Sequence, residues 1–160
     1  CYSGERAARY ATLKLSGLEQ APGHLAVFAD KASDIGHGLG RATMPETTEY
    51  SVVAAITAMW LAARAEGLGV GWVSIFHQAD LQQALGIPKG ITPIAYLCVG
   101  YVSHFHAKPE LETAGWRPRL PVEDLVYFEQ WGQRDDQQPL IAHLRCDQAA
   151  AQCSRQTAPA

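Results

Sequence analysis

One long apolar segment limits the folds open to this chain more than any other feature of its sequence. The residues from Val52 to Ala63 are apolar with the exception of Thr57. Thr43 and Glu46 have the spacing of a capping box, and Gly67 stands where a helix stop is expected. Because the middle of this segment is apolar almost all round, we expect a central helix packed on several sides.

Shorter patterns on either side of this helix indicate a sheet. Three apolar runs are typical of buried strands, and two runs of good helix formers indicate helices, the first of them with Gly17 as its stop signal. Residues 30–41 are polar and rich in glycine, as in a loop. We expect strands at 24–29, 70–76 and 92–102, and helices at 3–15 and 79–85. This alternation favours a sheet layered with helices, of the α/β or α+β class.

The character of the chain changes after residue 103. Residues 104–132 mix proline, tryptophan and charge without one periodicity, so we expect an extended arm over a surface. Residues 133–160 are polar and rich in alanine and glutamine, and we expect a disordered tail with one short helix near 140–150. The folded domain is therefore expected over residues 1–132.

Charge and composition exclude several functions. The net charge is −3 and the 13 basic residues are scattered, which argues against nucleic-acid binding. The longest apolar run is too short to span a bilayer, and the chain opens with no secretory signal. The four cysteines have no metal-ligand spacing, so we expect a reduced cytoplasmic setting without disulfides. His104 and His106 alternate as metal ligands can, but two solvent-facing loop histidines are the favoured interpretation.

Two small groups of residues are candidates for a binding site. Gly67, Gly69 and Gly71 lie between a helix and a strand, the reverse of the dinucleotide-binding order, so a helix cap and a turn are favoured. Glycine would also let a flavin ring approach the backbone. Ser74 lies outside any G-x-S-x-G elbow, and a hydroxyl bonded to strand backbone is its simplest interpretation.

A pair of arginines forms the other candidate. Arg117 and Arg119 flank Pro118 beside Trp116, and an arginine fork suits phosphate or carboxylate. A surface salt bridge is the simpler alternative. The residue patterns alone therefore indicate a domain with an anion site and name no reaction.

The longest motif adds a family. The run GRATMPETTEYSVVAAITAMWLAARAEGLGVGWVSIF, residues 40–76, resembles the 5,6-dimethylbenzimidazole synthase branch of the nitroreductase superfamily. The likeness continues through AYLCVGYV, GWRPRLPVEDLV and the final Trp131-Gly132, so it covers residues 3–132 in order. It implies an α+β nitroreductase-like FMN-binding fold, with a central mixed sheet flanked by helices.

The resemblance also implies an activity. In this branch reduced FMN is both ligand and substrate, and O2 is used to break it into 5,6-dimethylbenzimidazole, the lower ligand of cobalamin, and erythrose 4-phosphate. The enzyme is a homodimer with the flavin at the subunit interface, and a separate flavin reductase is a candidate partner. No metal, nucleic acid or membrane is implied.

Residue roles follow from the same resemblance. Gly71, Trp72, Val73 and Ser74 match the strand segment that lies along the flavin, and Ser74 would be catalytic, with its hydroxyl at the reactive edge of the ring. Arg119 matches the arginine that reaches the FMN phosphate. The segment Ser3-Gly4-Glu5-Arg6 resembles a lid over the flavin, and the helix around residues 50–60 would form core and dimer interface.

The sequence departs from the family pattern at its start. Family members carry an arginine-rich segment upstream that grips the FMN phosphate and contains an aspartate tied to catalysis, and nothing like it occurs here. We therefore interpret the chain as an N-terminally truncated fragment. Two alternatives are an NAD(P)H-dependent nitroreductase or flavin reductase on the same fold, and an inactive truncated relic that binds flavin.

Overall fold

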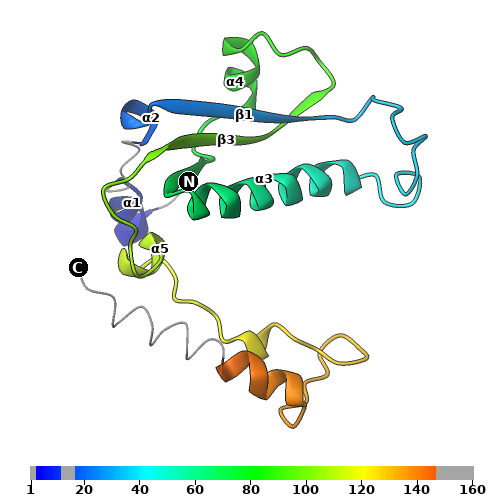
Figure 1. Cartoon of the computed structure of the whole chain (residues 1–160), viewed down its shortest axis with the longest axis vertical. Coiled ribbons are helices and arrows are strands. Elements are labelled where there is room, and N and C mark those ends of the chain that lie inside the picture. The colour runs from blue at the N-terminus through cyan, green and yellow to red at the C-terminus, as the bar shows by residue number, and fades with distance from the viewer. Residues whose placement is uncertain (1–2, 12–16, 147–160) are drawn as a thin grey trace. The chain divides into compact units, whose positions relative to one another are not determined.

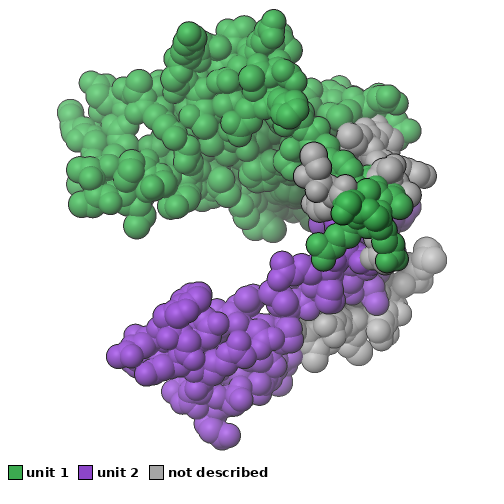
Figure 2. Space-filling model, turned by 180° about the vertical axis from the view of Figure 1, so that it is seen from behind, with its two compact units in different colours: residues 1–103 green, residues 104–160 purple. Residues whose placement is uncertain are grey.

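The computed structural model describes residues 3–11 and 17–146 of the 160-residue chain. The chain divides into two compact units, residues 1–103 and 104–160, which Figure 2 shows in green and purple. This division falls after residue 103, where the sequence changes character. Each unit is described by itself.

The first unit is built on a sheet whose described strands are β1 (Gly23–Asp30), β2 (Leu68–Val73) and β3 (Ile91–Tyr101), in the order β1-β3-β2 (Figure 1). All three predicted strands are present with shifted ends. Both pairings are antiparallel, so a mixed sheet would need a strand beyond these three. β3 is paired on both sides, which explains why it is the most apolar strand.

β2 is shorter than the sequence indicated. Its ladder with β3 ends where Val73 meets Tyr96, so residues 74–76 follow the strand instead of belonging to it. Continued pairing would bring Phe76 opposite Pro93, which has no N–H to donate to a ladder. β2 ends before that position, at Val73, and Ser74 follows the strand.

Helix α3 (Thr47–Ala65) crosses one face of the sheet and packs against all three strands. Ile56 is buried there, in a cluster with Ala95 and Leu97 of β3. The expectation of a helix packed on several sides is wrong for this chain by itself, because Tyr50 is 59% exposed and Leu61 is 69% exposed. The two are eleven residues apart, which places them on one stripe of the helix surface. That outer stripe is apolar and faces solvent in the isolated chain.

The ends of α3 only partly match the expected caps. Glu46 is the N-cap but has a helical backbone, and no side chain caps the helix there. The Thr43 hydroxyl instead donates to the carbonyl of Gly40 in the preceding turn, so it is not positioned to accept from Glu46, and the predicted capping box is wrong. At the other end Gly67 has φ of 77°, the left-handed conformation that terminates helices.

Three shorter helices complete the first unit. The helix predicted over residues 79–85 is α4 (Gln78–Ala84), which packs on β3. It ends in a Schellman turn, where the Ile87 N–H donates to the carbonyl of Gln82 over 2.8 Å. The helix expected over residues 3–15 is α1 (Gly4–Ala11) in its described part, and residues 12–16 lie outside the described residues. Gly17 begins the short helix α2 (Gly17–Gln20), so its predicted role as a stop signal is wrong.

The second unit contains α5 (Glu110–Thr113), the short 3-10 helix η1 (Val122–Asp124) and a helical segment over residues 139–146. Ile141 is buried at 2% exposure. Arg145 joins the helical segment to η1 through an ion pair with Glu123, and it also pairs with Asp136. The short helix expected near residues 140–150 is thus present in its described part, whereas residues 147–160 of the expected tail lie outside the described residues.

Candidate functional site

Three glycines lie just before and within β2. Contacts and backbone conformation within the chain explain why two of these positions are glycine. Gly67 needs its left-handed backbone. A Cβ at Gly69 would lie 2.4 Å from Cγ1 of Val102, so no other residue fits without a shift. Gly71 has neither reason: its φ is not positive, and a Cβ built there meets nothing within 4 Å. The space over Gly71 is therefore open to a group from outside the described chain.

The face of the sheet that carries Gly71 also carries a group of polar and aromatic side chains. Gly71 and His24 both pair with Cys98 of β3, from opposite sides. Tyr96, one step along the same face, has the His24 ring at 5.5 Å and the Phe76 ring edge-on at 6.0 Å between centroids. Helix α3 covers the other face, where Leu97 and Val99 of β3 contribute to the core around Ile56.

Burial decides the chemistry of Cys98. Its Sγ lies 3.8 Å from Nδ1 of His24, but the side chain is only 6% exposed. Burial raises the pKa of the Cys98 thiol, because the thiolate would lose its hydration. The group is therefore protonated near neutral pH and acts as a small core residue, as the sequence indicated.

Ser74 follows the last residue of β2 and is exposed. Among the described residues its hydroxyl has no hydrogen-bond partner, so the simple interpretation of a hydroxyl bonded to strand backbone is wrong. Trp72, two residues earlier, is 37% exposed on the α3 side of the edge strand, because its register partner is Leu97. Residues 71–74 thus form one continuous edge, in which Gly71, Trp72 and Ser74 are exposed and Val73 is half-buried.

Arg119 lies in the second unit, between α5 and η1, where its side chain is exposed. The surface salt bridge that was its alternative role is absent from the described part of the chain. The structure groups residues 71–74 and leaves Arg119 in the other unit. The lid candidates Gly4, Glu5 and Arg6 belong to α1.

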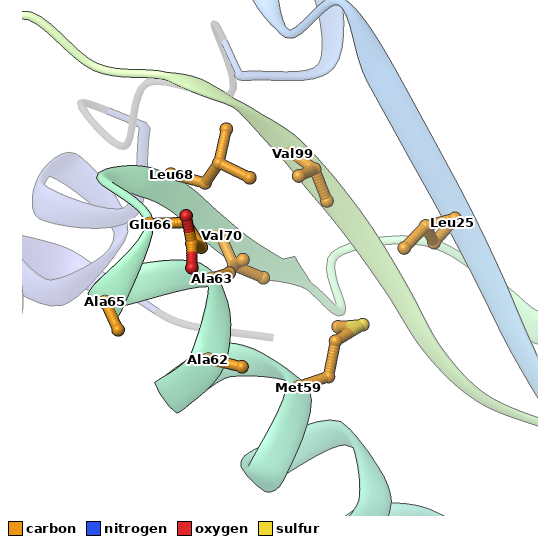
Figure 3. A pocket seen from close by; sticks show the side chains of 9 residues that line it. All are labelled: Leu25, Met59, Ala62, Ala63, Ala65, Glu66, Leu68, Val70 and Val99. Atoms are coloured by element: carbon orange, nitrogen blue, oxygen red, sulfur yellow. The ribbon is translucent and has the colours of Figure 1, made fainter.

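A cavity of about 440 Å³ lies between the C-terminal half of α3 and the sheet (Figure 3). Sequence reasoning missed it. The available signal was the cluster of alanines at the end of the helix, Ala62, Ala63 and Ala65, followed by the charged Glu66. Glu66 is the one charged residue among those that line it. The lining residues are Leu25, Met59, Ala62, Ala63, Ala65, Glu66, Leu68, Val70 and Val99.

A second cavity of about 480 Å³ lies between the loop after β1 and the start of α3. Arg41 lines it, but its guanidinium already donates to the carbonyl of Ser33.

Within residues 3–11 and 17–146 no three acidic, histidine or cysteine side chains gather as metal ligands would. His104 and His106 are in edge-on ring contact at 4.7 Å. No helix in the same residues is long and apolar enough to cross a membrane.

The chain belongs to the nitroreductase family. Its sequence matches the family model described as "Nitroreductase family" over residues 3–101. This span takes in the sheet, α3 and the exposed edge at residues 71–74, and it ends before Arg119. The α+β nitroreductase-like fold expected from the sequence is thereby confirmed.

Curated relatives within this family carry a more specific name. The chain is 56% identical over 117 residues to the 5,6-dimethylbenzimidazole synthase of Rhodospirillum rubrum. The aligned region covers 73% of this chain and 56% of that protein. It is 47% identical over 122 residues to a protein of the same name from Rhodobacter capsulatus, covering 76% and 59%. The chain thus spans less than two thirds of the length of these relatives. A crystal structure of a nitroreductase family protein from Clostridium difficile 630 aligns with a TM-score of 0.48 at 22% identity, over 81% of this chain and 71% of that one.

Proposed function

We propose that the complete protein is a flavin-dependent oxidoreductase of cobalamin biosynthesis that makes the lower ligand. In this proposal O2 is used to fragment reduced FMN into 5,6-dimethylbenzimidazole and erythrose 4-phosphate. The observation that carries it is the 56% identity to a protein named 5,6-dimethylbenzimidazole synthase. The matched family span includes the strand edge at residues 71–74, which supplies the candidate site.

The described residues fit a flavin at this edge. Gly71 leaves open space that neither its own backbone conformation nor a neighbouring atom requires. A planar ring could lie against backbone there without meeting a side chain at that position. Reduced FMN, when bound, would supply both the electrons for O2 and the ring atoms of the product. The backbone of Gly71, Trp72 and Val73 would hold and orient it.

Ser74 is proposed as the catalytic residue. Its position just beyond the β2 ladder leaves its hydroxyl exposed and free of partners among the described residues. A hydroxyl fixed beside the reacting edge can donate a hydrogen bond to an atom on which negative charge develops. Its proton stays on the serine oxygen in this role, so no neighbouring base is required.

Arg119 is proposed to bind the phosphate of the flavin. The guanidinium offers two parallel donors that match two phosphate oxygens, and its permanent charge keeps the interaction over the whole physiological pH range. No ion pair within the described residues competes for it. Its test is FMN affinity, since a phosphate contact remote from the ring should alter binding more than the chemical step.

We further propose a homodimer that uses the outer stripe of α3. The isolated chain exposes Tyr50 and Leu61 on that stripe, together with Val53 at 38% exposure. Exposed apolar side chains gathered along one helix indicate a surface that is covered by another chain. A second copy packed on α3 would also cover the apolar middle of the helix, which the sequence had marked as a central element.

The experiment is aerobic incubation of the full-length protein with chemically reduced FMN, followed by mass-spectrometric analysis for 5,6-dimethylbenzimidazole. We expect the product from the wild type and a rate lower by about 100-fold in Ser74→Ala, the scale for loss of one positioned donor. Ser51→Ala is the matched control, because the Ser51 hydroxyl donates to the carbonyl of Thr47 within α3. Its rate should equal that of the wild type.

Other outcomes select the alternatives. If FMN is reoxidised and recovered intact, the synthase proposal fails and an NAD(P)H-dependent nitroreductase or flavin reductase takes its place. If the full-length protein binds no flavin, the protein is a relic without this activity. A separate flavin reductase as partner would be indicated if NAD(P)H alone supports no turnover while added reduced FMN does.

A further inference from the structure

The cavity between α3 and the sheet has a lining that selects its occupant. Small side chains at Ala62, Ala63 and Ala65 leave the space beneath the helix unfilled, and Leu68 and Val70 of β2 form its apolar floor. A volume of about 440 Å³ is within the range of sites that bind small molecules. The space is open to solvent, because none of its lining residues is buried and Leu25 is 45% exposed. A small apolar molecule bound there would remove the apolar side chains of this lining from water.

The charge of Glu66 narrows the choice of occupant further. Glu66, the C-cap of α3, is exposed to solvent and lines this space beside Leu68 and Val70 (Figure 3). Its carboxylate has no ion pair or hydrogen bond within the described residues. A carboxylate accepts hydrogen bonds and repels anions, so it favours an occupant with an N–H donor and disfavours phosphates and carboxylates. The cavity is thus unsuited to FMN itself, whose phosphate is anionic.

We propose that this cavity binds a small bicyclic aromatic molecule carrying an N–H donor, and that its natural occupant is the 5,6-dimethylbenzimidazole released by the enzyme. The identity of the natural occupant rests on the proposed function. That product has an apolar edge with two methyl groups, which suits the floor and the alanines. Its imidazole edge carries the N–H that Glu66 would accept.

The position of the cavity suits a product site. Leu68 and Val70 face α3, while Gly71, in the same strand, faces the opposite side of the sheet because successive side chains alternate. A molecule in the cavity would therefore not occupy the open space over Gly71. Product could leave the proposed flavin edge and be held at the other face of the same strand.

The test measures direct binding of 5,6-dimethylbenzimidazole to the full-length protein. Binding is monitored by ligand-observed NMR and by titration of the fluorescence of the ligand. Ala63→Leu fills the cavity and should weaken binding at least about tenfold, a loss of 1.4 kcal/mol or more. Glu66→Gln should weaken it by about three- to tenfold, since a charge-assisted hydrogen bond becomes a neutral one. The matched controls are Ala58→Leu, exposed on α3 away from the cavity, and Glu46→Gln, and both should bind as the wild type does.

A second ligand separates charge from shape. 5,6-Dimethylindene has the same fused six- and five-membered rings and no N–H, so its affinity should be equal in wild type and Glu66→Gln and should fall in Ala63→Leu. Absence of saturable binding, or equal binding by wild type and Ala63→Leu, would overturn the proposal. Loss of self-association in Ala63→Leu with unchanged ligand binding would also overturn it, because a second copy would then be the occupant.

The two proposals can fail separately. Saturable binding with the expected variant pattern, in a protein that makes no 5,6-dimethylbenzimidazole, would keep the cavity as a site for N–H aromatics and remove its natural occupant. Product formation without saturable binding would leave the synthase proposal intact and overturn the cavity proposal.

Discussion

Gly71 of β2 stands directly opposite Cys98 of β3, so the thiol has a residue without a side chain on one flank and the His24 imidazole on the other. Cys98 itself is buried at 6% exposure, whereas the space over Gly71 is open. In an edge strand of a small sheet, such a gap is normally filled by a β-branched or aromatic side chain. The proposed flavin would fill this gap.

Gly71→Ala tests this explanation. Because the added Cβ meets nothing within 4 Å, the free energy of unfolding should change by less than about 1 kcal/mol. FMN affinity should fall in the full-length protein, measured by fluorescence titration. Gly69→Ala is the contrasting variant: its Cβ would lie 2.4 Å from Val102, and it should cost about 1–3 kcal/mol in urea unfolding. Unchanged FMN affinity in Gly71→Ala would remove the glycine from the site.

Local patterns in the sequence were sufficient for the framework of the first unit. The apolar runs of β1 and β3, and Gly67 after α3, appear in the structure close to where their patterns placed them. The errors come from contacts between distant residues. Ser74 continues an apolar run, but the ladder between β2 and β3 ends before it, at the pair of Val73 and Tyr96. Sequence pattern along one strand contains no information about that partner.

The candidate site likewise has one part that the sequence predicted and one part that it did not. The edge at residues 71–74 was identified by family resemblance, whereas the cavity beside Glu66 was not anticipated at all. A cavity depends on how far a helix stands from a sheet, and that distance is set by side chains of both elements together. Likewise, the apolar surface of α3 predicted that the helix would be buried on several sides. Within the described chain, only the side that faces the sheet is covered.

Leu97 should be the most sensitive position of the first unit. It is fully buried at 0% exposure in the central strand, in the cluster with Ile56 and Ala95. Leu97→Ala should lower the free energy of unfolding by about 2–5 kcal/mol, because it removes buried methyl groups and leaves a cavity. Leu39→Ala is the control, since Leu39 is 93% exposed, and should stay within about 0.5 kcal/mol. A small effect at Leu97 would mean that the sheet is not the stabilising core.

Leu61→Lys tests the proposed dimer. Leu61 is 69% exposed in the isolated chain, and lysine is a good helix former, so the helix itself should be unaffected. In a dimer packed on the outer stripe of α3, the substitution would bury an unpaired charge and shift the protein to monomer in analytical ultracentrifugation. Leu85→Lys, at 48% exposure after α4, should leave the association unchanged. A dimer that persists in Leu61→Lys would place the interface elsewhere.

Cys98 should be a slow nucleophile despite its histidine neighbour. Burial raises its thiol pKa above the ordinary value of about 8.5, so less thiolate is present at any given pH. Its alkylation by iodoacetamide at pH 8, followed peptide by peptide with mass spectrometry, should be at least about tenfold slower than that of exposed Cys146. In denaturant the two rates should converge.

The same shift fixes how stability depends on pH. A group whose pKa is raised in the fold binds its proton more tightly there than in the unfolded chain. The contribution of Cys98 is therefore complete below the ordinary thiol pKa and is lost as the pH rises through the raised value. Urea unfolding at pH 7 and pH 10 should show a loss that is smaller in Cys98→Ala. An equal loss in both proteins, or alkylation of folded Cys98 as fast as Cys146, would mean that the thiol is accessible from the open space over Gly71.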